Sequence, residues 1–113
     1  TFEKAKQLCR SQGGDLATFE TADQHDEFGQ ELSRLYEYPV WIGLSYKQPE
    51  GEFLWQDKQA LTFERWNKGQ PSERAGEECV SLNYRDQISG YGQWNHWTTA
   101  YCDFPLGFVC RLP

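Results

Sequence analysis

The chain has 113 residues, a formal net charge of −6 and 16% aromatic residues, and it contains no methionine. This length fits one domain with a modest core. The acidic balance argues against binding to nucleic acid or to an anionic membrane surface, because both require basic patches. No apolar run approaches the roughly 18 residues of a membrane-spanning helix, so we expect no membrane insertion by this segment.

The N-terminal residues 1–12 are predicted to form a helix. Thr1 can cap its first turn. Apolar residues recur on one face at helical spacing, and these are Phe2, Ala5, Leu8 and Cys9. The glycines at 13–14 end the helix, and residues 15–19 are expected to form a short strand or an extended link.

A second helix is predicted to begin after Thr21. Thr21 followed three residues later by Gln24 is typical of a capping box. The stripe predicted to be buried consists of Phe28, Leu32 and Leu35. We expect His25 on this helix to be a surface residue, and Pro39 to end the region.

The rest of the chain predicts short strands and one long loop. Residues 40–44 are almost entirely apolar, which indicates a central strand covered on both faces. Residues 57–78 are polar and contain glycine and proline, and a loop of this length in a small domain is usually functional. Further strands are predicted at residues 52–55, 79–82, 93–97 and 107–111. Helices followed mainly by strands indicate an α+β fold.

Five tryptophans anchor this pattern. Four of them are interpreted as core residues: Trp41, Trp55, Trp66 and Trp94. Trp97 has two open interpretations, since it can pack under the long loop or lie exposed beside a binding site, where it would suit ligand stacking.

Four cysteines occur, at positions 9, 79, 102 and 110. They include no C-x-x-C pair, which makes a structural zinc site a poor interpretation. An even number in a small acidic domain favours two disulfides and an oxidising compartment. Spacing alone leaves all three connectivities open.

Oxygen-bearing side chains are concentrated in two stretches, residues 69–79 and 92–97. Each stretch adjoins a predicted strand and a cysteine. Side-chain oxygens gathered where loops meet strands are suited to a hard cation or a polar ligand.

In this order, the motifs resemble a C-type lectin-like domain over almost the whole chain. They are the first helix ending in Cys9, Gly-Gly-Asp-Leu-Ala after it, Trp41-Ile42-Gly43-Leu44, Gly51–Trp55, Phe63-x-x-Trp66, Gly69-Gln70-Pro71, Glu77-Glu78-Cys79-Val80, Trp94-Asn95, and Cys102 with Phe108-Val109-Cys110. The resemblance implies that fold, an extracellular location and the pairings Cys9–Cys110 and Cys79–Cys102. It also implies a strand before the first helix, which this sequence lacks, so residues 107–111 are expected to be unpaired on one side. Residues 1–113 are therefore interpreted as a single domain excerpted from a longer extracellular protein with neighbouring domains.

In sugar-binding members, the resemblance implies a calcium ion held by side-chain oxygens. The matching positions are Gln70, Ser72, Glu77, Asn95 and His96. Only Glu77 is a carboxylate, and calcium affinity follows ligand charge, so calcium binding is predicted to be weak or absent. A second calcium position resembles Glu50, Glu73 and Glu77, with Tyr46 in place of an expected aspartate, and a solvated acidic loop is the preferred interpretation there.

The leading hypothesis is an extracellular recognition module that binds a protein ligand or a partner domain without calcium. The predicted face consists of Tyr46, Ser72, Glu73, Arg74, Asn95, His96 and Trp97. One alternative is a calcium-dependent lectin of the galactose type that uses Gln70, Glu77 and Asn95. Another is a non-binding spacer in a multi-domain receptor or matrix protein. No nucleophile or acid–base pair stands in a catalytic context, so the chain is not predicted to be an enzyme.

Overall fold

The computed structural model describes residues 1–113 except 36–37, 48–50, 73–75, 86–88, 90–91 and 112–113. In chain order the elements are α1 (Phe2–Ser11), β1 (Asp15–Leu16), α2 (Ala22–Leu35), β2 (Val40–Lys47), β3 (Glu52–Trp55), β4 (Cys79–Leu82), β5 (Trp97–Ala100), β6 (Gly107–Phe108) and β7 (Cys110–Arg111). The predicted α+β class, with two helices and mainly antiparallel sheets, is confirmed. No described helix has the length and apolar character needed to cross a membrane.

Both helices begin with the predicted caps. The Thr1 hydroxyl accepts a hydrogen bond from the Lys4 backbone amide at 3.2 Å. Thr21 does the same for the Gln24 amide at 3.1 Å, while the Gln24 side chain accepts from the Glu20 amide at 3.1 Å. These bonds satisfy amide groups that have no partner within the helix.

The buried face of α2 includes His25, so the prediction that His25 is a surface residue is wrong. Its side chain is fully buried, and Gly29 one turn later is buried as well. Phe28 and Leu32 lie on the same stripe and pack against the core. The spacing of these four residues is that of one helix face, so His25 belongs to the inner stripe by position although not by polarity.

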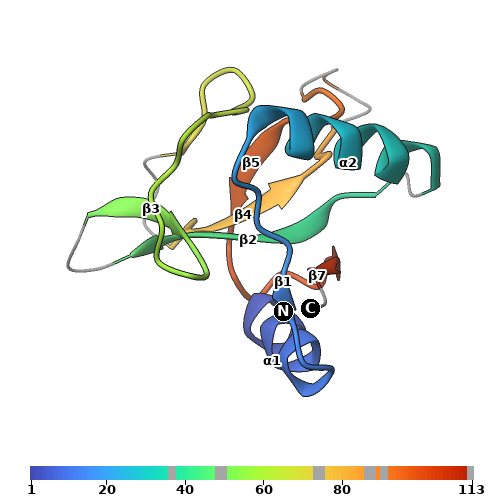
Figure 1. Cartoon of the computed structure of the whole chain (residues 1–113). Helices are drawn as coiled ribbons and strands as arrows, with labels where there is room; N and C mark the ends of the chain where they lie inside the picture. The colour runs from blue at the N-terminus through green and yellow to red at the C-terminus, as the bar shows by residue number, and fades with distance from the viewer. Residues whose placement is uncertain (36–37, 48–50, 73–75, 86–88, 90–91, 112–113) are drawn as a thin grey trace.

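The main sheet has the strand order β3-β2-β4-β5, and β6 pairs with β2 in parallel. β1 pairs with β7 in a separate two-stranded antiparallel sheet. In Figure 1, α2 runs along one side of the main sheet, and α1 lies at the far end of the molecule beside β1 and β7. Residues 107–111 therefore form two short strands, each with one strand partner among the described residues.

β2 is the central strand covered on both sides, as predicted. Trp41 belongs to a core cluster with Phe2 and other residues of α1, and the rings of Phe2 and Trp41 meet edge to face at 5.7 Å. Ile42 and Leu44 belong to the larger cluster beneath α2. Because side chains alternate along a strand, β2 contributes to both clusters. Each fully buried aliphatic side chain stabilises the fold by about 1.5–3 kcal/mol.

The last long strand was predicted at residues 93–97, and this prediction is wrong. β5 starts at Trp97 and pairs with β4, with Leu82 opposite Trp97 and Cys79 opposite Ala100. Gly92 and Asn95 adopt positive φ angles of 97° and 67°, which belong to turns rather than strands. The next residues, Trp97, Thr98 and Thr99, favour the extended conformation.

The two disulfides implied by the resemblance are confirmed. Cys9 of α1 is bonded to Cys110 of β7, with a Cα–Cα distance of 5.4 Å. Cys79 of β4 is bonded to Cys102 just after β5, with a Cα–Cα distance of 5.2 Å. The second bridge fixes the register between β4 and the end of β5, the strand that supports the candidate site.

Candidate functional site

A polar cluster forms where the long loop meets β5. We define it as Gln70, Ser72, Glu77 and Thr99. The Gln70 side-chain oxygen accepts hydrogen bonds from the Thr99 amide at 3.1 Å and the Thr99 hydroxyl at 2.8 Å. The Ser72 amide donates to the Thr99 hydroxyl at 3.1 Å, and the Ser72 hydroxyl donates to Glu77 Oε1 at 2.8 Å. Three of the predicted site residues are thus brought together around a threonine that was not predicted.

Buried Asn67 holds the loop in this position. Its side-chain amide donates to the Thr98 hydroxyl at 2.8 Å, and its side-chain oxygen accepts from the Gln93 amide at 3.0 Å. Its backbone amide donates to the Trp97 carbonyl, and its carbonyl accepts from the Gln70 amide, both at 2.9 Å. A buried polar residue with this many partners rigidifies its surroundings, so the polar cluster rests on a firm support.

The polar cluster lines one wall of a groove with a volume of about 960 Å³. The other walls include Tyr84, Tyr101, Phe104 and Leu106. Tyr101 can lie close to the long loop because Gly76 has no Cβ, and a Cβ at this position would meet the Tyr101 ring at 3.0 Å. The groove therefore combines one polar wall with aromatic walls, which is a common composition of binding sites.

Asn95 and His96 do not join the polar cluster. The Asn95 side-chain amide donates instead to Asp26 of α2 at 3.0 Å. His96 Nδ1 lies 2.9 Å from the Trp94 carbonyl oxygen. The structure therefore does not bring these two residues together with Gln70 and Glu77, because they precede β5 rather than lie on it.

Of the two tryptophans of this segment, Trp97 takes the buried one of its two open interpretations and Trp94 departs from its predicted place. Trp97 is fully buried in the larger core cluster, so its exposed alternative is wrong. Trp94, which was predicted to be a core residue, is half-buried, and the Arg85 guanidinium lies 5.0 Å from its ring centre. The strand begins at residue 97 instead of residue 93, so Trp97 lies on it and Trp94 precedes it.

The other predicted site residues lie elsewhere. Tyr46 lines a separate hollow together with Phe53, Trp66 and Pro71. Glu50, Glu73 and Arg74 fall outside the described residues.

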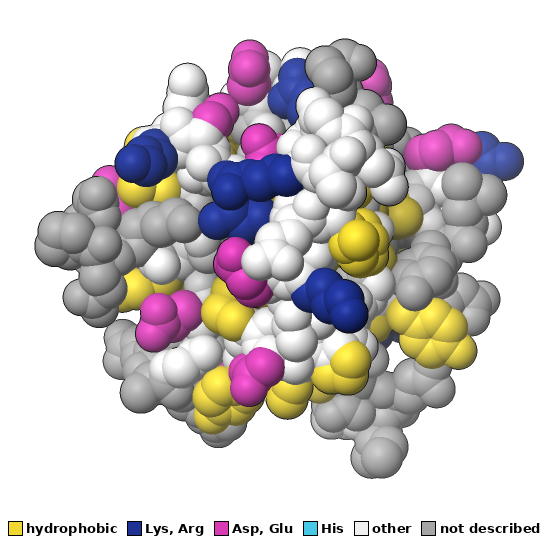
Figure 2. All heavy atoms as spheres, turned by 90° about the horizontal axis from the view of Figure 1, so that it is seen from below, with side chains coloured by type: hydrophobic (Ala, Val, Ile, Leu, Met, Phe, Trp, Pro, Cys, Tyr) yellow, Lys and Arg dark blue, Asp and Glu magenta, His cyan; other side chains and the backbone are white. Residues whose placement is uncertain are grey.

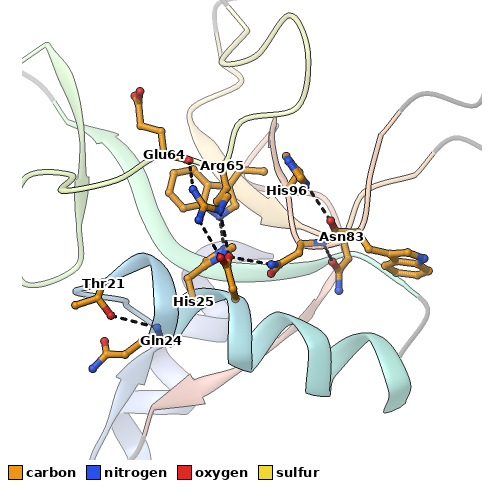
Figure 3. Close-up of polar contacts among 11 residues, drawn as sticks. Thr21, Gln24, His25, Glu64, Arg65, Asn83 and His96 are labelled. Atoms are coloured by element: carbon orange, nitrogen blue, oxygen red, sulfur yellow. Dashed lines mark hydrogen bonds and ion pairs between the residues drawn. The ribbon is translucent and has the colours of Figure 1, made fainter.

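A second set of polar contacts ties α2 to the segments before β5, and we call it the helix–loop network. It consists of His25, Asp26, Arg65, Asn95 and Trp97. Asp26 Oδ1 accepts a hydrogen bond from Arg65 Nε at 3.1 Å, and Oδ2 accepts one from Arg65 Nη2 at 2.9 Å. This is a bidentate ion pair. Figure 3 shows His25 and Arg65 converging from the helix and the loop. The hydrogen bonds from Arg65 lower the pKa of Asp26 well below its usual range, so this carboxylate remains charged.

His25 occupies the buried end of the network. The Trp97 indole, which is a donor only, donates to His25 Nε2 at 2.8 Å, so Nε2 is unprotonated. The proton therefore resides on Nδ1, which lies 3.0 Å from Asp26 Oδ1. Burial lowers the pKa of His25 despite the neighbouring carboxylate. A neutral histidine with both ring nitrogens bonded is a structural element and not a ligand-binding group.

Thr99 is the site residue that sequence reasoning missed. Trp97-Thr98-Thr99 repeats the aromatic-polar-polar order of Trp94-Asn95-His96 only three residues later. The strand propensity of the second triplet was the available signal. The family motif was matched to asparagine by residue type, whereas the fold places threonine there.

Comparisons with known proteins decide the family. The sequence profile described as Lectin C-type domain matches residues 1–112. The chain belongs to the C-type lectin domain family. The versican core protein of Rattus norvegicus is 32% identical over 113 residues, which cover 98% of this chain and 4% of that protein. The versican core protein of Mus musculus is also 32% identical, with 3% of its length covered.

Solved structures show the same fold. The carbohydrate-recognition domain of the mouse scavenger receptor C-type lectin has a TM-score of 0.79 and 26% identity, and the match covers 96% of this chain and 77% of that one. The cow C-type carbohydrate-recognition domain of CD23 has a TM-score of 0.78 and 28% identity, covering 99% and 80%. The predicted C-type lectin-like fold is thus confirmed. Domains of this family are generally non-enzymatic binding modules.

The donor groups of the polar cluster fit a calcium ion poorly. Calcium is held by six to eight oxygens, and carboxylates contribute most of the charge. The polar cluster offers one carboxylate, one amide and two hydroxyls, and the Gln70 and Ser72 oxygens already bond within the cluster. No group of three or more His, Cys, Asp or Glu suited to a metal occurs among the described residues.

Proposed function

We propose that this domain is an extracellular recognition module that binds a protein ligand or a partner domain through the face containing the polar cluster, without calcium. The observation that carries the proposal is the single carboxylate, Glu77, in a cluster whose other members are neutral. The Gln70 side-chain oxygen accepts two hydrogen bonds from Thr99. The face is therefore ordered by its own contacts.

Two further observations support the setting. Both disulfides connect elements of the folded core, and such bridges persist in oxidising compartments outside the cytosol. The versican relatives are far longer than the matched part. This supports a module that operates beside neighbouring domains of one chain, as opposed to a free-standing lectin. A purely structural spacer would not require the groove.

Calcium-dependent carbohydrate binding is the second candidate. It is favoured by the titles of similar structures, one of which names a carbohydrate-recognition domain and another an oligosaccharide. Gln70 and Glu77 would be its ligands in this chain, with Thr98 and Thr99 at the β5 positions in place of Asn95. This candidate requires the internal bonds of the polar cluster to open around the ion.

Thermal unfolding in calcium and in EDTA separates the two candidates. A ligand that binds only the folded state raises Tm by mass action, by about 10 °C at a concentration a hundredfold above Kd. We expect the same Tm in millimolar calcium and in EDTA at neutral pH. The Glu77→Gln variant is the matched control, because it removes the one carboxylate and retains a hydrogen-bond acceptor for Ser72.

A calcium-dependent rise in Tm that Glu77→Gln abolishes would overturn the proposal. Specific binding of a galactose-type glycan that EDTA reverses would overturn it independently. Substitutions across the groove that left every protein interaction of the parent chain intact would favour the spacer interpretation.

A further inference from the structure

We propose that the partner of this face is a protein segment with two cationic side chains, preferably arginines, one on each side of Pro71. This inference rests on the proposed protein-binding function of the same face and specifies the chemistry of the ligand. It involves the groove described above and a second depression, which we call the aromatic hollow. Pro71 lines both of them.

The groove offers an anion beside exposed aromatic rings. Glu77 is its charged lining residue among those described, and Tyr101 and Phe104 line the same space. Their rings lie 5.7 Å apart and are 41% and 49% exposed. A carboxylate bonded through one oxygen retains further acceptor positions, and an accessible ring face attracts a cation within about 6 Å. Together they suit a guanidinium group, which can stack and pair at the same time.

The aromatic hollow, which Pro71 also lines, has a volume of about 460 Å³ and combines carboxylates with aromatic rings that are half-buried. Phe53 contacts Tyr46 on one side and Trp66 on the other, with ring centres 5.4 and 5.1 Å apart. Glu64 lines the hollow and accepts a hydrogen bond from the Trp66 indole at 3.2 Å. Tyr46, which the sequence predicts as a ligand residue, lines this aromatic hollow.

Pro71, which lines both depressions, forms the ridge between them, and its neighbours in the sequence hold it in place. The Gln70 side chain and the Ser72 amide, which flank Pro71, both bond to Thr99 of β5. The Gln70 amide bonds to the carbonyl of buried Asn67. A ridge fixed from below keeps the two depressions at a constant separation, so a ligand with a matching spacing loses less entropy on binding.

Charge selects the class of partner. The described linings of the groove and the aromatic hollow contain three carboxylates, Glu52, Glu64 and Glu77, and no lysine or arginine. Figure 2 shows that the face at the α1 end, in contrast, mixes acidic, basic and hydrophobic side chains. An acidic partner would be repelled from the two depressions. Arginine over an aromatic ring also occurs within this chain, at Arg85 over Trp94 and at Arg65 over Phe63.

The probes are synthetic peptides with two arginines separated by glycine–serine spacers of graded length. In the matched peptide, citrulline replaces arginine, which keeps the shape and removes the charge. At one spacer length we expect the arginine peptide to bind at least about tenfold more tightly than its citrulline match. Added salt should weaken this binding, since the depressions are open to solvent. Titration calorimetry or NMR titration gives both Kd values.

Two isosteric variants locate the cations. Glu77→Gln and Glu64→Gln each remove one charge while preserving an acceptor for Ser72 and for Trp66. Each should weaken the arginine peptide by about threefold to tenfold. Glu78→Gln is the matched control, because Glu78 is exposed and adjacent to Glu77 but lies outside the linings of both depressions. In the wild type, binding should shift the NMR signal of the Trp66 indole N–H.

Equal binding of the arginine and citrulline peptides would overturn the inference. So would a loss of affinity in Glu78→Gln equal to that in Glu64→Gln and Glu77→Gln, or no binding of the arginine peptide at any spacer length. The proposed function is tested separately, and a Tm that rises with calcium would overturn it. If a protein protects Ser72 and Tyr101 from hydrogen exchange and yet is insensitive to Glu64→Gln and Glu77→Gln, the face binds protein but not through cations.

Discussion

The helix–loop network and the polar cluster use similar side chains for opposite purposes. In the network, Asp26 accepts from Arg65, Asn95 and His25, and its charge is compensated within the fold. In the polar cluster, Glu77 accepts a hydrogen bond from Ser72 and lines an open groove. Polar groups saturated in a packed environment stabilise and specify the fold. Those beside a groove retain the capacity to recognise a ligand.

The largest effect is expected from replacing two tryptophans. Trp97 belongs to the helix–loop network, whereas Trp94 lies outside both the network and the polar cluster. Trp97 is fully buried and its ring contacts those of Trp55 and Trp66, while Trp94 is half-buried beneath Arg85. Trp97→Ala should lower the free energy of unfolding by about 3–5 kcal/mol. Trp94→Ala should lower it by less than about 1.5 kcal/mol. Urea unfolding with the disulfides intact measures both, and equal losses would contradict the assignment of Trp97 to the core.

The sequence allowed the scaffold to be predicted but not the boundary between the two regions. Caps, apolar periodicity and cysteines report on local chemistry, so both helices and β2 were predictable. The start of β5 depends on which residues pair with Cys79–Leu82, a tertiary choice that residue type does not fix. Asn95 was assigned to the site because it resembles a ligand, whereas its partner Asp26 is distant in sequence.

A second test removes the close fit between α2 and the loop. A methyl group at Gly29 would overlap the Asn95 side-chain oxygen. Gly29→Ala should therefore destabilise the fold by about 1–3 kcal/mol, although alanine is the better helix former. In an Asn95→Ala background the overlap with the side-chain oxygen disappears and only a contact of 3.3 Å to the Asn95 Cβ remains, so the same change should cost less than about 1 kcal/mol. A double-mutant cycle of unfolding free energies checks this, and additive effects would show that the contact has no energetic role.

The smallest expected effect is a pH dependence that arises from His25. Burial lowers its folded-state pKa from the ordinary value of about 6.5. As the pH falls below that value, the unfolded chain takes up a proton before the folded chain does, so stability decreases with a slope of at most about 1.4 kcal/mol per pH unit. The groups around His25 are the Asp26 carboxylate, which opposes the shift, and Arg65 and His96, which reinforce it.

Protonation of Nε2 would also remove the acceptor for the Trp97 indole, so the fold itself opposes the charged state. His25→Gln keeps a neutral polar side chain at the position and should flatten the stability profile between pH 7 and the mildly acidic range, even though its stability at pH 7 is lower. Unfolding free energies of the two proteins across that range isolate the contribution of His25, because His96 is common to both. An unchanged slope in the variant would place the titrating group elsewhere. By contrast, the Glu77→Gln change in the polar cluster should leave that slope intact, since Glu77 is not among the groups that shift the pKa of His25.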